Sequence, residues 1–292
     1  VAQSDGAFIA GFTLTGGYAA NYGWTATVEM GKGVISNCVI RKTGRVSRSA
    51  AAYFYGTAKA VDCVFDGQGM TRNNDLDVQS GVRIERSAVL DRCVITSYRI
   101  DTHDGATYDG EAPVRIASST AVLRNSLVTL CTNGVSAAER HRGAVALVNG
   151  TIENCTIVGN WCGGYGGGVW AKNGKIVNSI VWGNTARKGG TDLYAATANP
   201  TVSFSCASDI GDWTGKTGEG NIADDPKFRA RGGIPYQLRA SSPCRDKADP
   251  LVWMTPEATD LLFHRLARHG LLRMPGGRIA AAGEVRGIRT CC

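Results

Sequence analysis

A short phrase that recurs along the chain constrains the fold more than any other feature. Each copy has an aliphatic residue, two residues that usually end in Asn or Asp, a Cys or Ser, and then further aliphatic residues. Such self-similarity, at intervals of 24 to 33 residues, is typical of a solenoid whose neighbouring units bury a shared core. The copies lie at 35–40, 60–65, 90–95, 123–128, 152–157 and 176–181, with a degraded seventh at 202–208.

The phrase is rich in β-branched residues and has no helical periodicity, so each copy predicts one rung of a parallel β-helix. A second phrase precedes each copy, with two apolar residues around a variable one. This in-out-in alternation is typical of a strand with one buried face. The variable residues should form one outward column on the helix: Glu29, Phe54, Arg83, Arg115, Ala146, Trp170 and Tyr194.

The apolar spacing within the first phrase requires a bend at the Asn, because a straight strand cannot keep all these residues inside. Asn and Asp tolerate left-handed backbone and suit such a corner, although Arg92 departs from the pattern. Each rung then has three strands. The small residue after the corner should lie in a buried column, which we favour over disulfides or a metal site. The column is Cys38, Cys63, Cys93, Ser126, Cys155 and Ser179, with Cys206 as its seventh member.

Composition agrees with an elongated solenoid, since the chain has 38 Gly and only 8% aromatic residues. No apolar run is long enough to span a membrane. The chain starts at Val1 without a signal peptide, so we interpret it as a fragment whose export signal lies upstream. Residues 263–292 carry six Arg and one Glu, and this tail accounts for most of the net charge of +7. We therefore expect no nucleic-acid partner.

These repeats resemble a family of secreted bacterial proteins with right-handed parallel β-helices, similar to polymorphic outer-membrane-protein repeats and to pectate-lyase-like folds. The resemblance is carried by GGGVW at 166–170, NSIVWGN at 178–184, DPKF at 225–228 and YQLRASSPCRD at 236–246. The last two look like the closing segment of the choice-of-anchor type. The resemblance implies about seven visible rungs in an all-β, right-handed helix over 1–208, a closing segment over 209–262, and export to the cell surface or beyond.

The family-like sequence ends near Leu262. Codons permitted for residues 268–274, read one base out of register, can spell the family's usual ending. We therefore interpret residues 263–292 as a frameshifted tail rather than a native domain.

Acidic residues in the connections between rungs offer one functional interpretation. Arg83 and Arg115 lie near them in the predicted stack, and the resemblance implies that such residues could form a Ca²⁺-assisted polysaccharide lyase, or a glycoside hydrolase using two Asp. No motif of either enzyme class is present, and solvated loop charge explains these acids more simply. The alternative catalytic residues are Asp101, Asp104, Arg83 and Arg115, and the alternative Ca²⁺ ligands are Asp75, Asp77, Asp101 and Asp104.

Recognition without turnover is the interpretation we favour. Aromatic faces stack on sugars, and arginines bind carboxylates or sulfates; aromatics also simply favour β-surfaces. We expect a monomer that binds a polysaccharide or cell-surface glycan without a cofactor. The candidate ligand-binding residues are Phe54, Arg83, Arg115, Trp161, Tyr165, Trp170 and Tyr194.

Overall fold

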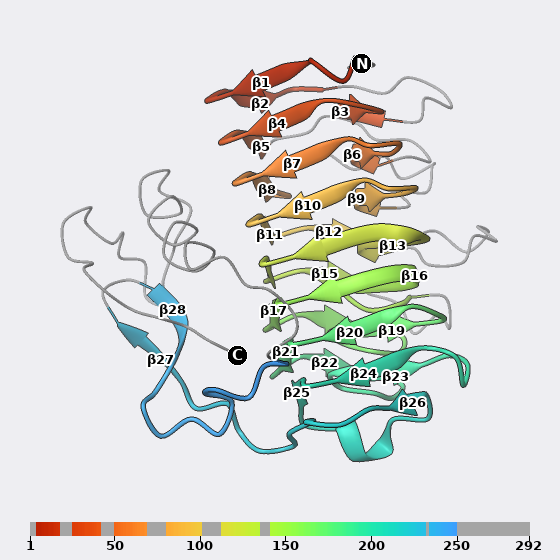
Figure 1. The fold of residues 1–292 in the computed structure, drawn as a ribbon, viewed down its shortest axis with the longest axis vertical. Coiled ribbons are helices and arrows are strands. Elements are labelled where there is room, and N and C mark those ends of the chain that lie inside the picture. The colour runs from red at the N-terminus through yellow and green to blue at the C-terminus, as the bar shows by residue number, and fades with distance from the viewer. Residues whose placement is uncertain are drawn as a thin grey trace.

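The chain folds as an all-β parallel solenoid, and the predicted fold class is confirmed. The computed structural model describes residues 4–17, 25–41, 50–68, 80–100, 112–134, 141–231 and 234–249. Figure 1 shows the strands stacked rung upon rung along one long axis, from β1 (Phe8–Ala10) at one end to β26 (Lys216–Thr217) at the other. Each complete rung contributes strands to three parallel sheets, here called A, B and C. The tail at 263–292 lies outside the described residues.

Sheet A contains both the strand of the outward column and the short strand that leads to the corner. The two run together in β13 (Ala112–Arg124) and β16 (Val145–Glu153). The separate strands before the corner are β1, β4 (Val34–Ser36), β7 (Lys59–Val61), β10 (Val89–Asp91), β20 (Lys175–Val177), β24 (Thr201–Ser203) and β26. The separate column strands are β3 (Thr25–Met30), β6 (Ala50–Phe54), β9 (Ser80–Ile84), β19 (Val169–Ala171) and β23 (Leu193–Ala195).

Sheet B follows the corner and holds the Cys-x-aliphatic part of the phrase. Over the described residues it has eight strands, seven of them from the predicted copies and one, β2, from the first residues of the chain. They are β2 (Thr13–Thr15), β5 (Val39–Arg41), β8 (Val64–Asp66), β11 (Val94–Thr96), β14 (Leu127–Thr129), β17 (Thr156–Val158), β21 (Ile180–Trp182) and β25 (Cys206–Ala207). Sheet C is shorter, with β12 (Arg99–Ile100), β15 (Thr132–Asn133), β18 (Trp161–Cys162) and β22 (Thr185–Ala186).

The predicted corner is left-handed in every rung where the phrase occurs. Asn37 has a φ of 52° and Asn154 has a φ of 52°, and Arg92 adopts the same φ of 52° although it lacks the Asn side chain. A second left-handed corner separates sheets B and C, for instance at Leu130 with a φ of 57°. Non-Gly residues adopt such angles at a cost, so the stacked sheets on both sides must hold them there.

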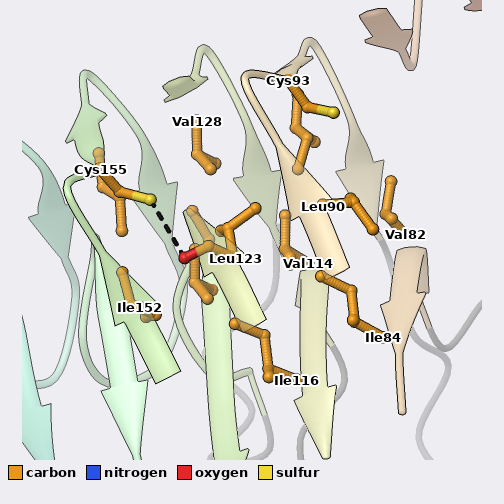
Figure 2. Packing of buried hydrophobic residues seen from close by; sticks show 14 of the residues in the cluster. Val82, Ile84, Leu90, Cys93, Val114, Ile116, Leu123, Val128, Ile152 and Cys155 are labelled. Atoms are coloured by element: carbon orange, nitrogen blue, oxygen red, sulfur yellow. Dashed lines mark hydrogen bonds between the residues drawn. The ribbon is translucent and has the colours of Figure 1, made fainter. Parts of the chain in front are cut away.

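The buried column of small residues is confirmed, and its six clear members are at most 3% exposed. The seventh member is Ser205 rather than Cys206, because Ile180 pairs with Cys206 and therefore Ser179 stands opposite Ser205. Each side chain donates to the carbonyl two residues earlier, as from Cys155 Sγ to Glu153 O at 3.2 Å. Figure 2 shows the Cys155 thiol also reaching Leu123 O in the preceding rung, at 3.5 Å. The column thus ties each corner to its neighbour.

The described part of the closing segment first continues the stack through β26 and then forms a hairpin that lies beside it. It contains a 3-10 turn (Ile210–Asp212) and an antiparallel hairpin of β27 (Phe228–Arg231) and β28 (Ile234–Leu238), seen next to the stack in Figure 1. Phe228 and Tyr236 pack on the outer, apolar side of sheet B, against residues such as Leu127 and Val158. None of the described residues forms a helix long and apolar enough to cross a membrane.

Candidate functional site

The outward column of sheet A is continuous through seven rungs. Its register runs from Glu29 to Tyr53, Arg83, Arg115, Ala146, Trp170 and Tyr194, each residue paired directly with the next. Six of these seven residues are the predicted ones. Parallel strands place equivalent side chains about 4.8 Å apart, so the column presents a regular row along the helix axis.

Phe54 was predicted for this column, and that prediction is wrong. Phe54 is fully buried and packs edge-to-face on Phe65, with 5.8 Å between ring centroids. Its neighbour Tyr53 pairs with Arg83 and is the residue that faces outward. Tyr53 stands between the buried residues Ala52 and Phe54, just as Arg83 stands between Val82 and Ile84. This similarity in the sequence could have identified Tyr53 as the outward residue.

A charged cluster forms in the column around Glu85, which directly follows β9. Its Oε1 accepts hydrogen bonds from Arg83 Nε at 2.7 Å and from an Arg115 terminal nitrogen at 2.9 Å. Its Oε2 accepts one from the Tyr53 hydroxyl at 2.9 Å. The Arg83 guanidinium also lies over the Tyr53 ring, 5.2 Å from its centroid. The sequence alone did not single out Glu85, because it falls just beyond the repeated phrase.

Burial, charge and hydrogen bonding shift the pKa values of this cluster. Burial raises the pKa of Glu85, but the charges and hydrogen bonds of Arg83, Tyr53 and Arg115 outweigh it, so the pKa lies below its usual value. Burial and the hydrogen bond to Glu85 raise the pKa of Tyr53 to about 12. Burial and the charge of Arg83 lower the pKa of Arg115. Two guanidinium groups therefore share the ionised carboxylate of Glu85.

The aromatic residues further along the column form a second cluster. Trp170 is only 4% exposed, because Arg142 lies over its ring, 4.3 Å from the centroid, and Tyr165 and Tyr194 pack beside it. The expectation that Trp170 offers an open face is therefore wrong. Tyr165 and Tyr194 stack with 4.6 Å between centroids and are each half-buried.

The structure separates Trp161 from this aromatic cluster. Trp161 lies on β18 in sheet C, where it pairs with Thr132 and Thr185 and not with residues of the column. Five of the seven predicted binding residues thus come together in two groups. One group is Arg83 and Arg115, and the other is Tyr165, Trp170 and Tyr194. Phe54 and Trp161 belong to neither.

The acidic residues of the enzymatic alternative, Asp75, Asp77, Asp101 and Asp104, lie outside the described residues. Within the part that is described, no three His, Cys, Asp or Glu side chains gather as a metal site would require. A predicted Ca²⁺ site in these connections therefore stays a prediction.

Comparison of the sequence with models of known protein families finds no match, and no curated protein matches the chain.

Proposed function

We propose that this protein is an exported or surface-exposed binding module whose outward column on sheet A holds an acidic glycan. The observation that carries the proposal is the Arg83–Arg115 pair, two half-buried guanidinium groups on adjacent rungs that share the single carboxylate of Glu85. Arginine binds carboxylates and sulfates through paired hydrogen bonds, so two guanidinium groups on adjacent rungs suit an acidic sugar.

The repeat of the column suits a linear ligand. A polymer that lies along the helix axis meets an equivalent position about every 4.8 Å, so weak contacts at successive rungs can add. The Tyr165–Tyr194 pair further along supplies half-buried aromatic faces for sugar rings, whereas the Tyr53 ring is occupied by Arg83 and by the stacked Tyr55. Trp170 has a supporting role, because its ring is covered by Arg142.

Export to the cell surface or beyond is part of the same proposal. It is supported by the resemblance of the repeats and of the closing segment to secreted bacterial β-helix proteins, and it fits a ligand found outside the cell. The proposal treats the protein as a monomer that needs no cofactor for binding.

A glycan array that carries carboxylated, sulfated and neutral glycans tests the proposal. We expect binding to acidic glycans that weakens as salt is added, because partly exposed charges are screened. Arg83→Gln and Arg115→Gln should each reduce affinity by roughly 10-fold, the cost of a lost charged hydrogen bond. Arg99→Gln is the matched control, since Arg99 is an exposed arginine on sheet C. Equal losses in all three variants, or a preference for neutral glycans, would contradict the proposal.

The runner-up, a polysaccharide lyase or hydrolase, predicts turnover. Incubation with polygalacturonate, followed by detection of unsaturated or reducing ends, distinguishes it from binding alone. If turnover occurs and is abolished in the Asp101→Asn/Asp104→Asn double variant, the enzymatic function replaces the binding function.

A further inference from the structure

Two cysteines that lie far apart in the sequence meet where the closing segment touches the stack. Cys206 begins β25 and faces outward from sheet B, because it pairs with Ile180 while Ala207 lies in the core. Cys244 follows β28 and is buried in the same small cluster as Cys206 and Ile180, which Phe228 and Leu238 partly cover. Each of the two cysteines is 2% exposed.

The two thiols interact directly. A side-chain hydrogen bond between Cys244 and Cys206 lowers the pKa of Cys244, and its effect outweighs that of burial. Cys206 Sγ also forms a hydrogen bond of 3.4 Å with the carbonyl oxygen of Asp224.

Other described cysteines are in a different environment. Burial raises the pKa of Cys63, Cys131 and Cys155 to about 12, and that of Cys162 to about 11. Their thiols donate to backbone carbonyls, as Cys155 does to Glu153. Because the thiolate is the reactive form, the lowered pKa of Cys244 favours its thiolate over those of the other cysteines.

We propose that Cys206 and Cys244 form a disulfide bond that fastens the closing segment to the last rungs of the β-helix. In the first step the Cys244 thiolate attacks a small disulfide such as oxidised glutathione, forming a mixed disulfide and releasing one glutathione thiolate. The Cys206 thiol then loses its proton and displaces the second glutathione. Two cysteine thiols are thereby oxidised, and one molecule of glutathione disulfide is reduced to two thiols.

The disulfide would stabilise the contact between the closing segment and the stack. The described residues otherwise make few hydrogen bonds across this contact. Tyr236 shares a hydrogen bond of 3.2 Å with Thr129, and the Asp249 amide donates to Asn178 Oδ1 at 2.7 Å. Beneath the hairpin lie apolar outward residues of sheet B, including Leu127 and Val158. The cross-link would keep this apolar surface covered. The inference does not depend on the glycan proposal, since these residues lie on sheet B rather than in the column of sheet A.

Peptide mapping of the full chain tests the bond. The reduced protein is incubated with oxidised glutathione, alkylated, and digested with trypsin without reductant. We expect the peptide 189–216, which contains Cys206, to be joined to the peptide 240–245, which contains Cys244. The Cys93→Ser variant, altered at a ladder position where serine occurs naturally in other rungs, should give the same joined pair. Separate alkylated or glutathionylated peptides, or Cys244 joined to Cys291 or Cys292, would overturn the proposal.

Thermal unfolding provides a second readout that does not depend on digestion of the protein. Oxidation should raise the midpoint of the wild-type protein by roughly 5–10 °C, because the bond restricts the unfolded chain. The Cys244→Ala variant should unfold at the same temperature before and after oxidation. An equal rise in this variant, or no rise in the wild type, contradicts the inference.

Discussion

Arg115 on β13 donates a hydrogen bond of 2.9 Å to Glu85, which belongs to the preceding rung. The bond crosses from one turn of the solenoid to the next through side chains rather than through the backbone. Because Glu85 also binds Arg83 in its own rung, this one carboxylate fixes the relative positions of two positive charges in the column.

Replacing Glu85 with Gln should destabilise the protein by about 1–2 kcal/mol, because two guanidinium groups then lose their charged partner in a half-buried site. Urea unfolding at neutral pH measures the loss. Glu219→Gln, at an exposed position, is the control and should change the free energy of unfolding little.

The effect of Glu85 should depend on pH. The folded state lowers the pKa of Glu85 below its value in the unfolded chain, which is about 4.3. The contribution of Glu85 to the free energy of unfolding is therefore fully present above that value. It is lost as the pH falls through the lower pKa of the folded state. The difference in stability between the wild type and Glu85→Gln should therefore shrink in acid. A difference that grows as the pH is lowered would contradict this assignment.

Trp170→Ala should cost about 3–5 kcal/mol of stability, because the ring is almost fully buried beneath Arg142 and beside Tyr165. Tyr194→Ala removes a half-buried ring and should cost clearly less. Thermal and urea unfolding of the two variants, compared side by side, checks the order. If both variants are as stable as the wild type, Trp170 is more open than the structure indicates.

The left-handed corner at Asn154 should tolerate glycine better than alanine. Its φ of 52° is accessible to glycine without strain, whereas alanine should destabilise the protein by roughly 1–2 kcal/mol. Both substitutions remove the hydrogen bond from Asn154 to Asn125 at 3.3 Å, so the difference between them isolates the backbone term. Equal stability of the two variants, measured by urea unfolding, would argue against a strained corner.

Cys155→Ser should be nearly neutral, because Ser126 and Ser179 fill the same position in the neighbouring rungs and donate to the same type of carbonyl. Cys155→Leu should cost about 1–3 kcal/mol, since a close-packed column has no room for the added atoms. Calorimetric unfolding of both variants tests this. A strongly destabilised serine variant would mean that the column requires sulfur at this rung.

The repeat in the sequence was sufficient to predict the solenoid, the corner and the buried column, because each depends on the same few positions in every rung. Prediction failed where one rung departs from the others. At 53–55 three aromatic residues stand in a row, so polarity does not reveal which one faces outward. At the seventh copy Phe204 occupies the corner with a φ of 47°, so Ser205 is the small residue, and the prediction placed it one residue too late, at Cys206.

The candidate site was less predictable because it depends on contacts between rungs. Arg142 covers Trp170 from a different turn of the chain, and no local pattern relates the two residues. Glu85 lies beyond the phrase, and its role appears only when Arg83 and Arg115 are stacked beside it.

The left-handed corner also determines where the chain can change in length. The stretch from the column residue to the small residue beyond the corner is nearly constant from rung to rung, whereas the return stretch to the next column residue varies widely. An insertion within a strand before the corner shifts the side chains that follow it to the opposite face unless a bulge absorbs it, as one does between β13 and β16. An insertion in the return stretch leaves the register of the stacked strands unchanged. The protein can therefore acquire new surface loops beside the column while the rungs that carry the column residues stay in place.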